Sequence, residues 1–214
     1  GAALTIPIGY ARESAEAVTV GGKVMHEGKP VSGAEIYFCN QVEQTVAKVG
    51  TSGGDGSFSF TAPRSVLTAE DWFEPAVIAF DSRYAVGWAM MNGSVDRSNM
   101  IIDLAEPKEQ SGTVKDASGN PVENAEVAIR FVANAVVGVQ NRLLLPSWSF
   151  PLLSAFTDSE GKYTIKNLPD ANMSVLIARK KGYAISISEM RPNATKEISI
   201  TMNPGGRITG RVTI

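Results

Sequence analysis

Short stretches in which apolar and polar residues alternate recur along the chain and predict β-strands. Every second residue is apolar in residues 125–131 and again in residues 34–38, which puts Cys39 on the face opposite to the apolar one. A period of two sends successive side chains to opposite faces of a sheet, so one face of each strand covers a core. The main helical pattern is a short insertion over residues 65–73, with Thr68 as its N-cap.

The predicted strands belong to an internal repeat. Four sequence blocks of the first half return in the same order in the second half. The matched residues are 22–36 with 112–127, 55–60 with 160–165, 77–85 with 176–184, and 100–104 with 198–202. Because four ordered matches are hard to obtain by chance, we predict two copies of one module. Residues 132–156 form a long insertion that only the second copy has.

Short strands separated by turns, with little helical periodicity, are typical of a β-sandwich. We therefore predict an all-β fold made of two tandem sandwiches. The expected domains are a lead-in segment (residues 1–17), a first sandwich (18–106), a second sandwich (107–204) and a linker (205–214). Within that linker, residues 209–212 resemble residues 111–114, which indicates the first strand of a further repeat.

The repeated blocks resemble the carboxypeptidase regulatory-like domain, a transthyretin-like sandwich. The shared motifs are G-x-V, then G-x-P-V-x-G-A-x-V, then T-x-x-x-G-x-[FY]-x-[FI], and a strand that ends near G-Y. The first copy has Arg83 in place of the glycine at Gly182, and the second has Asn124 in place of Gly33. Asparagine tolerates a positive φ, so that turn should survive. The resemblance implies a seven-stranded prealbumin/Ig-like Greek-key sandwich in each copy, used as an accessory module without catalytic residues.

Composition and charge exclude several classes of protein. The chain is 43% hydrophobic and 20% charged, as packed globular domains are, and its net charge of −2 comes from interspersed acids and bases. Such a surface does not favour nucleic acid as a partner. No apolar run is long enough to span a membrane, and a single cysteine excludes an intrachain disulfide. Together with the resemblance, this favours an extracellular, cell-surface or periplasmic location, although no signal peptide lies in this sequence.

Few residues have catalytic or metal-binding potential. His26 is the only histidine of the sequence. The sequence has neither the ligand spacing of a zinc site nor the G-x-S-x-G motif of a hydrolase nucleophile. We therefore interpret His26 as a solvated turn residue. Cys39 has no flanking histidine or cation, so we interpret it as a packing residue. Asp55 and Asp158 could ligate calcium, but turns favour aspartate for backbone reasons. We predict no catalytic, metal or cofactor site, and expect that the chain is not an enzyme.

A covalent cross-link is a further alternative. Lys115 and Asn203 could form an intramolecular isopeptide bond, as in pilin-type sandwiches, although the first copy has Met25 at the matching position. Intact-mass measurement decides this, because the bond removes about 17 Da as ammonia.

Aromatic and apolar side chains gather in the two insertions. The predicted interaction surface consists of Trp72, Phe73, Leu145, Trp148 and Phe150. Such loops either bind a partner or fold as lids over a core, and we favour the lid. The expected function is a structural or interaction module of a larger exported protein, with a protein or glycan partner and with other domains of the same chain. Alternatives are a carbohydrate- or peptide-binding module, and a regulatory appendage of a peptidase or transporter encoded elsewhere in the polypeptide.

Overall fold

The computed structural model describes residues 16–67, 74–91, 97–136, 139–146, 151–171, 173–190, 197–206 and 209. The described residues form β-strands and two short 3-10 helices, which confirms the all-β fold. The strands of the first half are β1 (Ala17–His26), β2 (Lys29–Pro30), β3 (Glu35–Asn40), β4 (Thr45–Thr51), β5 (Ser57–Pro63), β6 (Ala76–Phe80), β7 (Gly87–Met90) and β8 (Met100–Asp103). Those of the second half are β9 (Lys108–Asp116), β10 (Glu126–Val136), β11 (Val139–Leu144), β12 (Ser154–Phe156), β13 (Lys162–Leu168), β14 (Met173–Arg179), β15 (Ser186–Met190) and β16 (Glu197–Met202).

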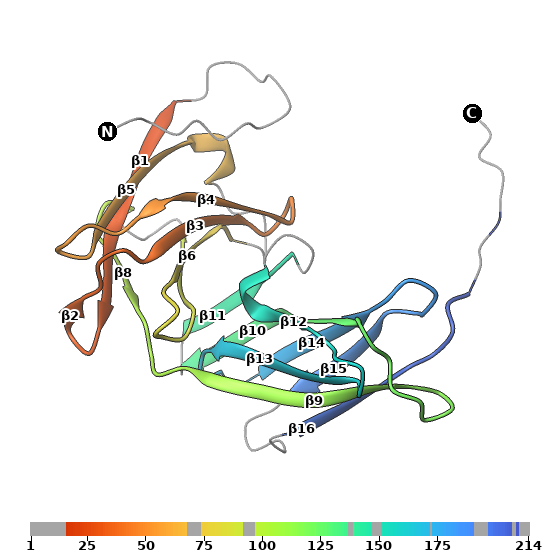
Figure 1. Ribbon diagram of the computed structural model, residues 1–214. Coiled ribbons are helices and arrows are strands. Elements are labelled where there is room, and N and C mark those ends of the chain that lie inside the picture. Colours follow the sequence, from red (N-terminus) through yellow and green to blue (C-terminus); the bar gives the residue numbers. More distant parts are fainter. Residues whose placement is uncertain are drawn as a thin grey trace, which may run out of the picture.

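The first eight strands make two sheets that face each other (Figure 1), which we call the first unit. In one sheet β1 lies between β5, which is antiparallel to it, and β8, which is parallel. The other sheet has the order β4-β3-β6-β7. Apolar residues of both sheets form one buried cluster, which includes Val24, Ile36, Phe58, Val77 and Ile102. This cluster is the interior of a β-sandwich.

The last eight strands, the second unit, repeat this topology. Strand β9 lies between antiparallel β13 and parallel β16, and β10 pairs with both β12 and β14, which in turn pairs with β15. The addition is β11, which comes from the predicted insertion and extends the sheet on the far side of β10. Among the described residues each unit thus has one strand more than the expected seven. The extra strand is the two-residue β2 in the first unit and β11 in the second.

The repeat extends to the register of the strands. Gly22 lies opposite Phe58 and Met100, and Gly112 lies opposite Tyr163 and Ile198, which are the matching positions. A Cβ atom at Gly22 would lie 2.1 Å from the Met100 carbonyl oxygen, and one at Gly112 would lie 1.9 Å from that of Ile198. Glycine is therefore required in both units because the neighbouring backbone occupies the space of a side chain.

Two local predictions meet different outcomes. Asn124 has a φ of 52° where Gly33 has 79°, which confirms that asparagine replaces glycine in a left-handed turn. The helix expected over residues 65–73 is only partly covered by the structure: a single 3-10 turn spans Arg64–Val66, and residues 68–73 with the proposed Thr68 cap lie outside the described residues.

Candidate functional site

One candidate site is the joint between the two units. Cys39, Ile78 and Trp88 point away from the interior of the first unit and are buried. They belong to the same apolar cluster as Leu143 and Leu153 of the second unit. The second unit thus covers the outer face of the β3-β6-β7 sheet, which would otherwise be exposed to solvent. The insertion after β10 provides part of the contact surface.

Backbone and amide hydrogen bonds fix the joint. The Val86 N–H donates to the Asn167 carbonyl oxygen at 2.9 Å, and the Asn167 amide donates to the carbonyl oxygens of Ser82 at 3.0 Å and Tyr84 at 2.7 Å. Asn167 has a φ of 59°, a conformation that asparagine adopts more readily than most residues. One residue at the end of β13 therefore holds the loop that precedes β7.

A second polar contact crosses the joint beside Cys39. The Leu144 N–H of β11 donates to Oε1 of Gln41 at 2.7 Å, and Gln41 is itself buried. Burial raises the pKa of the Cys39 thiol to about 12, so that it carries no thiolate at neutral pH. Cys39 is therefore a packing residue of the joint, as the sequence predicts.

His26 is not the solvated turn residue that the sequence indicates. It ends β1, its side chain is only 17% exposed, and its ring lies 4.2 Å from the ring of Tyr84, centroid to centroid. Nδ1 donates to the Leu104 carbonyl oxygen at 2.8 Å, while Nε2 is 3.5 Å from a carboxylate oxygen of Glu106. The correction has a tertiary cause, because strand β8 and the loop before β7 close over the end of β1.

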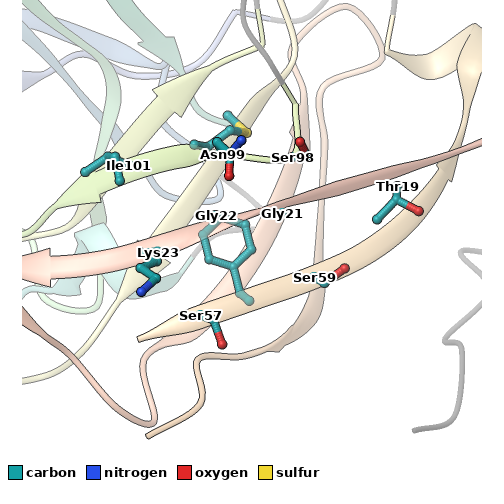
Figure 2. A pocket seen from close by; sticks show the side chains of 11 residues that line it. Thr19, Gly21, Gly22, Lys23, Ser57, Ser59, Ser98, Asn99 and Ile101 are labelled. Atoms are coloured by element: carbon teal, nitrogen blue, oxygen red, sulfur yellow. The ribbon is translucent and has the colours of Figure 1, made fainter. Parts of the chain in front are cut away.

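A trough lined by both polar and apolar residues lies on the outer face of the β5-β1-β8 sheet (Figure 2). It has a volume of about 370 Å³, and its floor is formed by Gly21 and Gly22, which have no side chains. The other lining residues are Thr19, Lys23, Ser57, Phe58, Ser59, Ser98, Asn99, Met100 and Ile101. In the second unit Ser111 replaces Gly21, and its hydroxyl lies 3.0 Å from that of Thr164. Position 111 of the second unit thus carries a side chain where position 21 of the first unit has none.

The aspartates of the two acidic turns accept hydrogen bonds from residues of their own turn. Oδ1 of Asp55 accepts hydrogen bonds from the Ser57 hydroxyl at 2.6 Å and the Ser57 N–H at 3.1 Å. Oδ1 of Asp158 likewise accepts the N–H groups of Glu160 and Lys162, both at 2.9 Å. These contacts are those of aspartate in tight turns. Within the described ranges, no group of three or more His, Cys, Asp or Glu side chains is arranged to hold a metal.

The structure places only one residue of the predicted interaction surface. Leu145 is 1% exposed and belongs to the apolar cluster that contains both the interior of the second unit and the residues of the joint. Trp72, Phe73, Trp148 and Phe150 lie outside the described residues, and their role as a surface stays a prediction.

The two residues considered for an isopeptide bond, Lys115 and Asn203, are both exposed. Lys115 lies opposite Thr201 in the register of β9 and β16.

The sequence missed Asn167, Gln41 and Trp88 as residues of the joint. The outward positions of β3 are occupied by Glu35, Tyr37 and Cys39, so the pattern of this strand did not indicate that its outer face is covered.

The joined sandwiches define the chain as an all-β protein of the sandwich class. Residues 111–203 match the carboxypeptidase regulatory-like domain family, which confirms the resemblance for the second unit. The first unit shares its topology, register and turn glycines. No curated protein sequence matches the chain.

Several solved structures are similar to this chain at low identity. The shaft pilin SpaA from Lactobacillus rhamnosus GG is 13% identical, with a TM-score of 0.35 over 92% of this chain and 100% of the pilin. A streptococcal ancillary pilin is 10% identical, with a TM-score of 0.35 over 88% of this chain and 63% of that one. The major pilin RrgB from Streptococcus pneumoniae is 9% identical, with a TM-score of 0.31 over 89% and 48%. Among the described residues, no helix has the length and apolar character needed to cross a membrane.

Proposed function

We propose that the chain is a non-catalytic structural and interaction module of an exported or cell-surface protein. Its two sandwich domains, residues 18–106 and 107–204, act as one stiff element that spaces or presents other parts of the polypeptide. The buried joint carries this proposal, because a module meant only to tether two parts has no use for a desolvated interface between its units.

Two features of the joint support stiffness. The first is its apolar character: Ile78 and Trp88 of the first unit are buried together with Leu145 of the second. Domain motion is the default within a chain unless the interface is large and hydrophobic. The second is the short connection, since β8 ends at Asp103 and β9 begins at Lys108. A connection of this length leaves little slack for one unit to rotate away from the other.

The proposal is tested by the distance between spin labels on the two units. Ser57→Cys on β5 and Thr201→Cys on β16 place the labels on exposed residues, while native Cys39 is buried and protonated. A stiff joint gives one narrow distance distribution in the otherwise unmodified chain. A broad distribution there contradicts the proposal.

Variants of the joint provide the matched comparison. Asn167→Gly keeps the left-handed backbone but removes the amide that binds Ser82 and Tyr84, so it should broaden the distribution. Ile101→Ala removes an exposed apolar side chain away from the joint and should leave the distribution unchanged.

The trough on the β5-β1-β8 sheet favours a second candidate function, the binding of a glycan or an extended peptide by the first unit. Hydroxyl groups of Thr19 and Ser59 with the Lys23 ammonium offer hydrogen bonds beside Gly21 and Gly22, which have no side chains. Titration of a broad glycan and peptide panel, followed by chemical shifts of the Gly21 and Gly22 amides, tests it. Gly21→Ser introduces the residue of the second unit and should abolish any shift. A flat response across the panel excludes this function.

A further inference from the structure

The outer faces of two equivalent sheets differ in exposure at their last strands, β7 in the first unit and β15 in the second. In the first unit Tyr37, Ile78 and Trp88 stand in one row across β3, β6 and β7. The same row in the second unit, across β10, β14 and β15, contains Ala128, Ile177 and Ile187. Both rows are apolar, and in the second row Ala128 and Ile177 are buried while Ile187 is exposed.

The residues at β7 and β15 differ in exposure because, among the described residues, only the first unit has another unit packed on this face. Val86 is 1% exposed and Trp88 is 9% exposed, because the second unit packs on this face. The residues at the matching positions, Ile185 and Ile187, are 65% and 68% exposed. Ile185 and Ile187 thus form an exposed apolar pair at the edge of an otherwise apolar face, and such patches mark interaction sites.

An apolar hollow adjoins this row on the same face. It has a volume of about 500 Å³ and is lined by Gln41, Arg130, Phe131, Arg142, Leu144, Met173 and Val175. Phe131 lies opposite both Val175 and Leu144 in the register of the sheet. The hollow continues the established joint, since Gln41 and Leu144 take part in that interface as well.

The path of the chain indicates what occupies the face. After the first unit, the Ala85 N–H donates to the Ala105 carbonyl oxygen at 2.9 Å, and Gly112 follows Ala105 by seven residues on β9. After the second unit, the Ala184 N–H donates to the Asn203 carbonyl oxygen at 2.9 Å, and a glycine again follows by seven residues. That glycine belongs to residues 209–212, whose T-G-R-V matches the S-G-T-V of β9.

We propose that the outer face of the β12-β10-β14-β15 sheet docks a further sandwich of the same kind, which starts at residues 209–212. It would cover Ile185 and Ile187 as the second unit covers Val86 and Trp88, so that successive units repeat one joint. This inference rests on the proposed structural function and names its partner as the next unit of the same polypeptide.

The experiment compares the 214-residue chain with the natural polypeptide extended through the residues that follow. Ile187→Cys is introduced in both, and its reaction with a maleimide is followed by mass spectrometry. Docking should slow the reaction of this cysteine in the longer chain by about tenfold or more, which corresponds to ~1.4 kcal/mol. Ile101→Cys is the matched control, because Ile101 is 55% exposed on the outer face of another sheet and should react equally in both chains.

Three results would overturn the inference. The first is that the residues that follow in the natural polypeptide do not form a sandwich, and the second is that Ile187→Cys reacts equally fast in both chains. The third is that Ile187→Cys is protected in the 214-residue chain alone, to a degree that grows with the concentration of the chain. The last result assigns the face to a second copy of the chain. None of the three affects the spin-label distance between the first two units, so failure here is distinguishable from failure of the proposed function.

Discussion

Ser52 and Thr157 make the same pair of buried hydrogen bonds in the two units. The Ser52 hydroxyl accepts the Ala34 N–H at 2.9 Å and donates to the Val31 carbonyl oxygen at 2.7 Å. The Thr157 hydroxyl accepts the Ala125 N–H at 2.8 Å and donates to the Val122 carbonyl oxygen at 2.6 Å. In each unit the hydroxyl joins both ends of the turn that leads into the central strand of the second sheet.

Removal of either hydroxyl should destabilise its own unit. Ser52→Ala and Thr157→Val leave a buried N–H and a buried carbonyl without their partner, which costs about 1–3 kcal/mol in the free energy of unfolding. Chemical denaturation followed by circular dichroism measures the change. Ser59→Ala, at an exposed position of β5, should change the free energy by less than about 0.5 kcal/mol. Equal effects of the buried and exposed variants would disprove the role of the hydroxyl.

Glycine at position 112 should be irreplaceable. In Gly112→Ala the new methyl group meets the Ile198 carbonyl oxygen, so β9 and β16 must separate. Overpacking of this kind costs about 1–3 kcal/mol or more. Thermal unfolding of the variant should begin at a lower temperature than that of the unmodified chain. Gly50→Ala is the control, because a Cβ there meets no atom within 4 Å and should be tolerated.

The thiol of Cys39 should be inert in the folded chain. Because its pKa is raised to about 12 by burial, the thiolate that reacts with disulfide reagents is absent at pH 8. Ellman's reagent should therefore give no colour until denaturant is added, and then one equivalent per chain. Rapid reaction of the native chain would show that the joint opens.

Acid should weaken the loop that carries Arg83. The Arg83 guanidinium, which binds both carboxylate oxygens of Asp81, holds the pKa of that carboxyl below its ordinary value of 3.8. A carboxyl with a lowered pKa stabilises the fold above its ordinary pKa, and this contribution disappears as the pH falls through the folded pKa. It should amount to no more than about 1 kcal/mol, because the Arg83 side chain is exposed.

Asp81→Asn isolates this effect. The unmodified chain should exceed the variant in free energy of unfolding at pH 7, and the difference should shrink as the pH is lowered below about 3.8 in urea titrations. A difference that stays constant from pH 7 to pH 2 would assign the effect of the substitution to the hydrogen bonds of the turn instead.

The sequence predicted the strands well and the covering of their faces poorly. Alternation in residues 34–38 identified Ile36 and Phe38 as core residues and placed Tyr37 and Cys39 opposite, as the structure shows. The alternation did not show that the outer face of β3 is covered as well. A period of two looks the same in the sequence whether the outward side chains contact water or another unit. His26 was wrongly assigned to solvent for the same reason, since β8 and Tyr84 approach it from far away in the sequence.

By itself, the sequence determined the all-β class, the family resemblance, the repeat and the turn residues, because these depend on local spacing and on the backbone angles of glycine and asparagine. Only the tertiary structure decided that Asn167 and Gln41 hold the units together, and that Trp88 is buried where Ile187 is exposed. Those outcomes depend on contacts between residues far apart in the chain, which no local pattern encodes.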